Sequence, residues 1–328
     1  MIISRAYDRS VDPAPAQLAA LAAIVDHGTF EAAARHLHVT PSAVSQRIRS
    51  LEQAAGQVLV RRTTPCRPTV AGEALVRLAR QTALLRAEAA EVLAGVGAGP
   101  VVLTVAVSAD ALATWFRGVL AELARPAPDG SVVALRLHVE DQAYSADLLR
   151  RGDALGAVTS EPGVVQGCSS EPLGALRYHA VASRSLLPDG PGPDAPAGLP
   201  MVVYNEQDDL QHAVLRARGL PEPPVVHRVP TSADFAEAVR LGLGWGLLPE
   251  PQLAPMLAAD EVVDLGPDPV DVALHWQRWR LDTPALDRLS DAVRRAARAG
   301  MRPAGGVGGG VGGGLSAGSG AAGATGGW

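Results

Sequence analysis

Four polar side chains between Ser42 and Arg49 have the clearest chemistry in this sequence. Ser42, Ser45, Gln46 and Arg49 recur at the three- and four-residue spacing that places side chains on one face of a helix. Glutamine can pair bidentately with adenine, and arginine with guanine, so these residue types suit hydrogen bonds to base edges in the DNA major groove. No carboxylate interrupts the row. The pattern predicts a recognition helix.

Arginines also follow this helix, in a segment that predicts a two-stranded wing. Residues 58–60, Val-Leu-Val, predict a short strand, which leads through Arg61 and Arg62 into a Thr-Thr-Pro turn and then to Arg67. A basic wing would contact phosphates or the adjacent minor groove. The candidate DNA contacts are Thr29, Thr40, Ser42, Ala43, Ser45, Gln46, Arg49, Arg61, Arg62 and Arg67.

Three short helices must position these groups. Gly28 can end the first helix in a left-handed conformation, whereas Thr40 supplies an N-cap oxygen and Pro41 suits the first position of the third helix. Apolar residues recur with helical spacing over residues 18–25, 30–37 and 44–55. Two helices, a tight turn, a third helix and a wing together predict a winged helix-turn-helix over residues 13–70.

The charge distribution indicates a separate DNA-binding part. Residues 28–80 contain eight arginines and three acidic residues, a net charge of +5, whereas the whole chain carries −5. The remainder therefore carries −10, which is typical of a DNA-binding domain joined to one that does not bind DNA. A soluble helical domain with surface arginines is the alternative, but it explains neither the wing nor the carboxylate-free row.

Length and composition limit the remaining possibilities. At 328 residues the chain can form two or three compact units, and 47% hydrophobic residues suffice for their cores. Cys66 and Cys168 make neither a disulfide framework nor a metal site. No segment resembles a signal peptide or a membrane span, so we expect a cytoplasmic, nucleoid-associated protein with no membrane partner.

A long helix is expected after the wing, with Thr69 as its N-cap and residues 71–94 as its body. Its apolar residues recur at alternating three- and four-residue steps, which is the a/d spacing of a coiled-coil seam. We expect this seam to join copies of the chain into a dimer or tetramer, although a helix lying on its own domain would show a similar pattern. Residues 95–100 then predict a hinge. The predicted seam consists of Leu75, Leu78, Thr82, Leu85, Ala89 and Val92.

Strands and helices are expected to alternate from residue 101 to 300. The pattern predicts two α/β lobes, one from about 101–177 and 269–300 and the other from about 178–268. Open α/β sheets bind ligands outside the carboxyl ends of their strands, so two sheets side by side would place a ligand between them. The expected strands cover 101–108, 132–139, 155–159, 178–182, 201–204, 225–229, 245–248, 261–265 and 270–276, with helices from near Asp110 and over 143–151, 208–218, 232–241 and 284–299.

With these features the chain resembles the LysR-type transcriptional regulators over residues 13–300. The resemblance implies an N-terminal winged helix-turn-helix, a long linker helix and a C-terminal α/β two-lobed effector domain similar to periplasmic binding proteins. It implies double-stranded DNA, a second copy of the chain and RNA polymerase as partners. The matching residues are Gly28–Phe30, Ala33–Ala34, Leu37, Pro41–Ser45, Ile48, Leu51–Glu52, Gly56, Leu59, Arg62, Thr69 and Ala71–Gly72.

Longer stretches resemble the ArgP/LysG subgroup of that family, which senses basic amino acids. They are residues 42–75, 108–115, 139–142, 148–160 and 173–178. The subgroup implies L-lysine or L-arginine as co-inducer or co-repressor, no cofactor, and control of an exporter of these amino acids or of a metabolic gene. A LysR-type regulator of another small-molecule pathway remains the alternative.

An amino-acid effector needs groups for its carboxylate and for its positive charges. Ser108, Ala109 and Asp110 lie where a strand passes into a helix, whose N-terminal N–H groups suit a carboxylate. Hydroxyls at strand ends add hydrogen bonds, and aspartates suit the positive charges, although an aspartate at such a junction is more often an N-cap. The candidate effector contacts are Ser108, Ala109, Asp110, Asp141, Thr159, Ser160, Tyr204, Asp208 and Asp234.

Two other classes of protein fit parts of the sequence. An enzyme would need a nucleophile or a phosphate loop, but Cys168 has no evident activating histidine and no Walker or GxGxxG loop opens a βα unit. A solute-binding protein would share the two-lobed domain, but the winged helix and the missing signal peptide count against it. We therefore expect neither enzyme activity nor a metal site. Residues 1–12 and the glycine-rich residues 301–328 are expected to be flexible and disordered.

Overall fold

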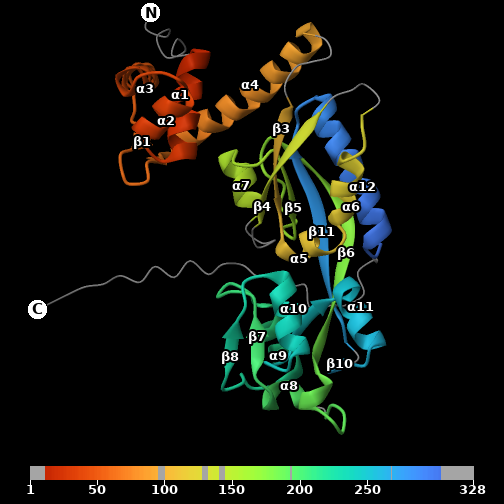
Figure 1. The fold of residues 1–328 in the computed structure, drawn as a ribbon. Helices are drawn as coiled ribbons and strands as arrows, with labels where there is room; N and C mark the ends of the chain where they lie inside the picture. The colour runs from red at the N-terminus through yellow and green to blue at the C-terminus, as the bar shows by residue number, and fades with distance from the viewer. Residues whose placement is uncertain are drawn as a thin grey trace, which may run out of the picture. The chain divides into compact units, whose positions relative to one another are not determined.

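The computed structural model describes residues 12–94, 100–127, 132–139, 145–192, 194–266 and 268–303, and Figure 1 shows their helices and strands. Most of the predicted flexible N-terminus, hinge and tail lies outside the described residues, as does Asp141. Contacts between Cα atoms divide the chain into two compact units. The first extends to Gly174 and includes residues 273–303, and the second includes Ala175–Val272.

A winged helix-turn-helix begins the first unit (Figure 1). Its elements are α1 Pro15–His27, α2 Phe30–His36, α3 Pro41–Ala55 and the antiparallel pair β1 Val60–Arg61 and β2 Arg67–Pro68. Thr40 caps α3 with its hydroxyl oxygen and Gly28 ends α1 with a φ of 75°, as the sequence predicts. Thr29, predicted only as a DNA contact, caps α2 in the same way. The helices share one apolar core, which includes Leu21, Ile24, Ala33, Val44, Ile48, Leu51 and Leu59.

The long helix α4 Val70–Ala94 follows the wing. Thr69 caps it, since Thr69 Oγ1 accepts a hydrogen bond from the Gly72 N–H at 3.1 Å. Leu78 and Leu85 of the predicted seam are 39% and 45% exposed, whereas Leu75 packs against the apolar core of the helix-turn-helix. The described part of the chain therefore leaves the seam uncovered at Leu78 and Leu85. Another side is buried through Val76, Ala79 and Leu84.

A mixed sheet forms the rest of the first unit. β3 Val101–Val107 lies between β4 Val133–Val139 and β5 Gly156–Thr159, parallel to both, and β11 Val270–Trp279 is antiparallel to β5. The helices of this part are α5 Ala109–Ala113, α6 Arg117–Leu123, α7 Ser145–Arg151 and α12 Pro284–Gly300. Most of β3 is buried on both faces, which is typical of a central parallel strand.

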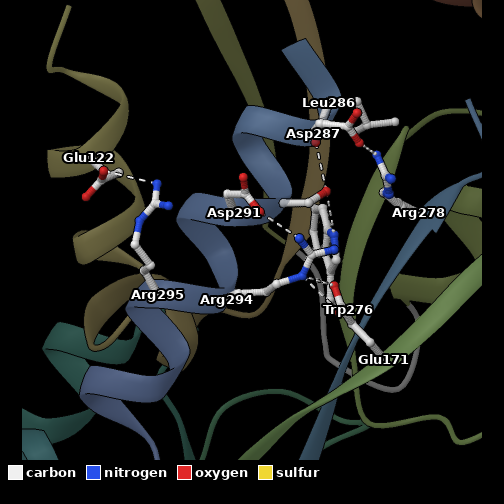
Figure 2. Close-up of polar contacts among 10 residues, drawn as sticks. Glu122, Glu171, Trp276, Arg278, Leu286, Asp287, Asp291, Arg294 and Arg295 are labelled. Carbon is white, nitrogen blue, oxygen red and sulfur yellow. Dashed lines mark hydrogen bonds and ion pairs between the residues drawn. The ribbon is translucent and has the colours of Figure 1, made fainter. Parts of the chain in front are cut away.

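Ion pairs and a buried hydrogen bond connect α12 to the rest of the first unit (Figure 2). Trp276 Nε1 donates to Ser290 Oγ at 3.1 Å, and this hydroxyl donates to the Leu286 carbonyl oxygen at 2.7 Å. Because the Trp276 side chain is buried, its N–H would otherwise lack a partner. Charged contacts surround this bond and comprise Arg294–Glu171, Arg294–Asp291, Arg278–Asp287 and Arg295–Glu122.

In the second unit, β9 Gly246–Pro249 and β10 Val262–Asp264 pair antiparallel with the long strand β6 Cys168–Ser183. A separate parallel pair consists of β7 Met201–Val203 and β8 Val226–Arg228. The helices are η1 Arg184–Leu186, α8 Ala195–Gly198, α9 Leu210–Arg218, α10 Ser232–Arg240 and α11 Glu250–Ala258. Val181, Val202, Phe235, Val239 and Leu248 belong to their shared core.

The sheets differ from the prediction in continuity and extent. Instead of two separate sheets, seven strands share one hydrogen-bonded order, β10-β6-β11-β5-β3-β4 with β9 on β6. The reason is that β6 and β11 each continue from one unit into the other. β6 begins at Cys168 and not at Tyr178. The prediction missed the first half of this strand because Pro172 and Gly174 weaken the strand pattern there.

Boundaries of other elements differ as well, and three helices had no predicted counterpart. The single helix expected near Asp110 is divided into α5 and α6, because Trp115 and Phe116 are buried at the junction, where Thr114 has a ψ of −109°. The first wing strand begins at Val60, since Val58 is 62% exposed. η1, α8 and α11 are the helices that the sequence did not predict.

Candidate DNA-binding interface and effector site

The third helix presents the polar face that the sequence predicts. Ser42, Gln46 and Arg49 are exposed, and Ser45 is half-buried. Ser42 Oγ lies 2.9 Å from Thr40 Oγ1, while the side chains of Gln46 and Arg49 make no hydrogen bond or ion pair within the residues that the structure describes. The buried side of the helix carries Val44, Ile48 and Leu51, each at most 1% exposed. The polar flank therefore projects outward.

Glu52 joins α3 to the wing, a role that its place in the family signature does not reveal. Its Oε1 accepts hydrogen bonds from the N–H groups of Leu59 at 2.9 Å and Val60 at 3.4 Å. At the other side of α3, Gln17 Nε2 donates to Ser50 Oγ at 3.1 Å. Since these contacts tie α3 to both the wing and α1, they set the orientation of the recognition helix.

The wing carries two arginines directly opposite each other. Arg61 pairs with Arg67 across β1 and β2, and both are exposed. Like charges at directly opposed positions destabilise a strand pair, so this arrangement suits an anion such as a phosphate. Arg62 has a different contact, because its guanidinium carbon lies 4.9 Å from the centre of the Phe30 ring in α2.

Five of the predicted effector residues gather at the carboxyl ends of two neighbouring strands. β3 and β5 are parallel, and their register, continued to the strand ends, sets Ser108 beside Thr159. Ser108 is the N-cap of α5, and its Oγ accepts a hydrogen bond from the Ala111 N–H at 3.2 Å. Thr159 is fully buried and accepts one from the Glu161 N–H at 3.0 Å. The structure therefore brings together Ser108, Ala109, Asp110, Thr159 and Ser160.

Tyr204, Asp208 and Asp234 lie in the second unit, close to the carboxyl ends of β7 and β8. The buried Asp208 carboxylate accepts hydrogen bonds from the N–H groups of Tyr204 at 2.8 Å and Leu210 at 3.2 Å. Asp234 Oδ2 accepts one from the Thr231 hydroxyl at 2.5 Å, in the first turn of α10. These contacts lie at the starts of α9 and α10, although the N-cap residues of the two helices are Asp209 and Thr231.

The loop after β5 is held by a residue that the sequence analysis missed. Gln277 of β11 is fully buried, its Oε1 accepts a hydrogen bond from the Val165 N–H at 3.0 Å, and its Nε2 donates to the Gly163 carbonyl oxygen at 2.8 Å. These bonds fix the segment that directly follows Thr159 and Ser160. The signal in the sequence was its place directly after the expected strand 270–276, next to Trp276, because an amide that is buried beside such a strand requires hydrogen-bond partners.

Cys168 does not have the properties of a catalytic nucleophile. Its side chain is 1% exposed, and this burial raises the pKa of the thiol to about 12. The positive charges of Arg280 and Arg77 act in the opposite direction but are the smaller effect. Since the thiolate is the reactive form, the group stays protonated and inert at neutral pH. The described residues also contain no cluster of three or more side chains able to bind a metal ion, and no described helix could span a membrane.

Two family models match the chain. Residues 15–73 match the helix-turn-helix of the bacterial regulatory proteins of the LysR family, and residues 100–298, more than half of the chain, match the LysR substrate binding domain. The chain belongs to the LysR family. The predicted fold class is therefore confirmed, with a helix-turn-helix domain followed by an α/β substrate-binding domain. Members of the LysR family are DNA-binding transcriptional regulators, so the prediction of a regulator and not an enzyme is confirmed as well.

Several LysR-family relatives share almost half of their residues with this chain. The lysine export transcriptional regulatory protein LysG of Corynebacterium efficiens is 49% identical over 294 residues, which cover 88% of this chain and 99% of LysG. Full-length LysG from Corynebacterium glutamicum with the bound effector Arg is 44% identical, with a TM-score of 0.72, and covers 88% of this chain and 100% of that one. ArgP from Mycobacterium tuberculosis is 48% identical, with a TM-score of 0.77 and coverages of 88% and 98%. The resemblance to the ArgP/LysG subgroup is confirmed.

Proposed function

We propose that this LysR-family regulator responds to L-arginine or L-lysine and controls a gene for amino-acid export or metabolism. The solved structure of full-length LysG with bound Arg carries the proposal, because the whole length of LysG matches this chain at 44% identity. The name of the relative from Corynebacterium efficiens, a regulator of lysine export, supports the class of target gene.

We assign effector binding to the carboxyl ends of β3 and β5. The start of α5 at Ser108 and Ala109 offers N–H groups for the α-carboxylate, and Thr159 and Ser160 offer hydroxyls. Asp110, in the first turn of α5, is assigned to a positive group of the effector. Asp208 and Asp234 support helix starts in the second unit, which makes them weaker candidates.

Operator DNA is assigned to the winged helix-turn-helix, residues 13–70. Gln46 and Arg49 are exposed on α3 and would hydrogen-bond to base edges in the major groove, next to Thr29, Thr40, Ser42, Ala43 and Ser45. Arg61 and Arg67 would contact phosphates, because two positive charges at directly opposite strand positions favour an anion between them.

Two copies of the chain are proposed to pair through α4. Residues 71–94 of this helix form the linker. The exposed Leu78 and Leu85 are the features that favour this pairing, because the described part of the chain leaves them uncovered. A dimer would place two winged helices on two half-sites of the operator, and two dimers would make a tetramer. As a regulator it would act at the nucleoid with RNA polymerase as a further partner.

Titration calorimetry tests the effector assignment. Addition of L-arginine and L-lysine to the full chain is expected to release or absorb heat, with L-histidine and L-glutamate as comparison ligands. Asp110→Asn should weaken binding about 10- to 100-fold, since a hydrogen bond to a charged group contributes about 1.5–3 kcal/mol. No heat with either basic amino acid, together with heat from another small metabolite, would assign the regulator to a different pathway.

A further inference from the structure

Arg80 of α4 binds carboxylates from two different parts of the first unit. Arg80 Nη2 lies 2.5 Å from Asp26 Oδ1 in α1, and Arg80 Nη1 lies 2.6 Å from Asp153 Oδ1 in the turn between α7 and β5. The Arg80 side chain is only 21% exposed, so solvent screens these pairs less than ordinary surface pairs. One guanidinium thus connects the DNA-binding helices to the α/β part of the chain.

The turn that carries Asp153 also contacts the backbone of α4. A Cβ on Gly152 would lie 2.8 Å from the Arg77 Cα atom, and Gly152 has a φ of +72°, so the close approach requires glycine. The Arg77 guanidinium donates to the Arg150 carbonyl oxygen and lies 5.8 Å from the centre of the Trp279 ring. Because the backbone of the turn lies against the backbone of α4 here, a shift of the turn would displace α4, which carries Arg80.

The same turn is linked to the loop after β5. Arg150 at the end of α7 pairs with Glu161 at 2.8 Å and with Asp147 at 2.5 Å. These contacts raise the pKa of the Arg150 guanidinium, and the hydrogen bond that Arg150 donates to the Glu161 carboxylate is the largest cause. The Glu161 N–H in turn donates to Thr159 Oγ1, at the strand end to which effector binding is assigned. An unbroken series of contacts therefore joins Thr159 to Asp26.

We propose that Arg80 couples effector binding to DNA binding within one chain. Effector binding would shift the loop at Thr159 and Glu161, the shift would reach Asp153 through α7, and Arg80 would pass it to Asp26 of α1. The inference rests on the proposed function, because it needs an effector that changes DNA affinity. Its measure is the factor by which the effector changes that affinity, which is about 5- to 150-fold in typical allosteric proteins.

The experiment measures this coupling factor in the full chain and in three variants. The variants are Arg80→Gln and Asp153→Asn, which break the contact from either side, and Arg86→Gln, which alters an exposed arginine on the same helix as a matched control. A duplex selected from a randomised pool for binding to the wild type serves as DNA. Its affinity is determined with and without saturating L-arginine and L-lysine, and calorimetry gives the amino-acid affinity without DNA.

The proposal expects the coupling factor to fall to within about twofold of 1 in Arg80→Gln and Asp153→Asn, whereas Arg86→Gln keeps the wild-type value. Amino-acid affinity without DNA should change less than about twofold in all variants, which separates lost coupling from a lost site. A wild-type coupling factor in Asp153→Asn, or in a folded Arg80→Gln, would overturn the proposal. If DNA affinity of the wild type does not respond to either amino acid, the proposed function fails and this inference fails with it.

Discussion

Replacement of Gln277 by leucine should loosen the loop after β5 with little change in side-chain volume. The substitution leaves the Val165 N–H and the Gly163 carbonyl group without the partners they have at 3.0 and 2.8 Å. A buried polar group that loses its partner costs about 1–3 kcal/mol, so the two together should lower the free energy of unfolding by about 2–6 kcal/mol. At about 2–4 °C per kcal/mol for a unit of this size, Tm should fall by about 4–24 °C.

Calorimetric unfolding of the full chain measures this loss, and amide hydrogen exchange locates it. The peptide that contains Val165 should exchange faster in Gln277→Leu, while the α3 peptides keep their wild-type rates. Gln207→Leu, at an exposed glutamine, is the control and should leave Tm within about 1 °C of the wild type. An unchanged exchange rate at Val165, or a Tm as close to the wild type as that of the control, would show that Gln277 does not hold this loop.

Three further experiments test other parts of the structure. Gln46→Ala should reduce the preference for the selected base by about 1–3 kcal/mol, and an unchanged base preference would remove Gln46 from the DNA-contacting face of α3. Arg61→Ala should instead weaken binding to all sequences and lower the salt slope by about 0.9 per chain. Competition binding at several salt concentrations distinguishes the two effects. Leu78→Arg with Leu85→Arg should convert the assembly to monomers in sedimentation experiments without a loss of folded structure, and an unaltered assembly would exclude the α4 seam. Cys168 should resist alkylation at pH 8 until the chain unfolds, because burial raises the pKa of its thiol to about 12, and rapid modification of the folded chain would contradict this protonated state.

The sequence was sufficient for those features of the winged helix-turn-helix that depend on residues close together in the chain. The caps at Thr40 and Thr69, the left-handed Gly28 and the outward flank of α3 all follow from side chains within four residues of one another. The helical spacing of apolar residues reports directly on which side is buried, so the winged helix-turn-helix was predictable as a unit. The proximity of the proposed effector residues at the ends of β3 and β5 was predictable, since parallel strands end at the same edge.

Only the tertiary structure decided the contacts between distant residues. Gln277 meets Val165 across 112 positions, and Arg80 meets Asp26 and Asp153 across 54 and 73. β6 likewise extends through a proline and a glycine because its neighbours supply the hydrogen bonds. Local spacing determines helices, caps and faces because their partners lie within a turn of the chain. The partner of a buried amide or a shared guanidinium depends instead on strand order and register, which leave no mark in the neighbouring residues.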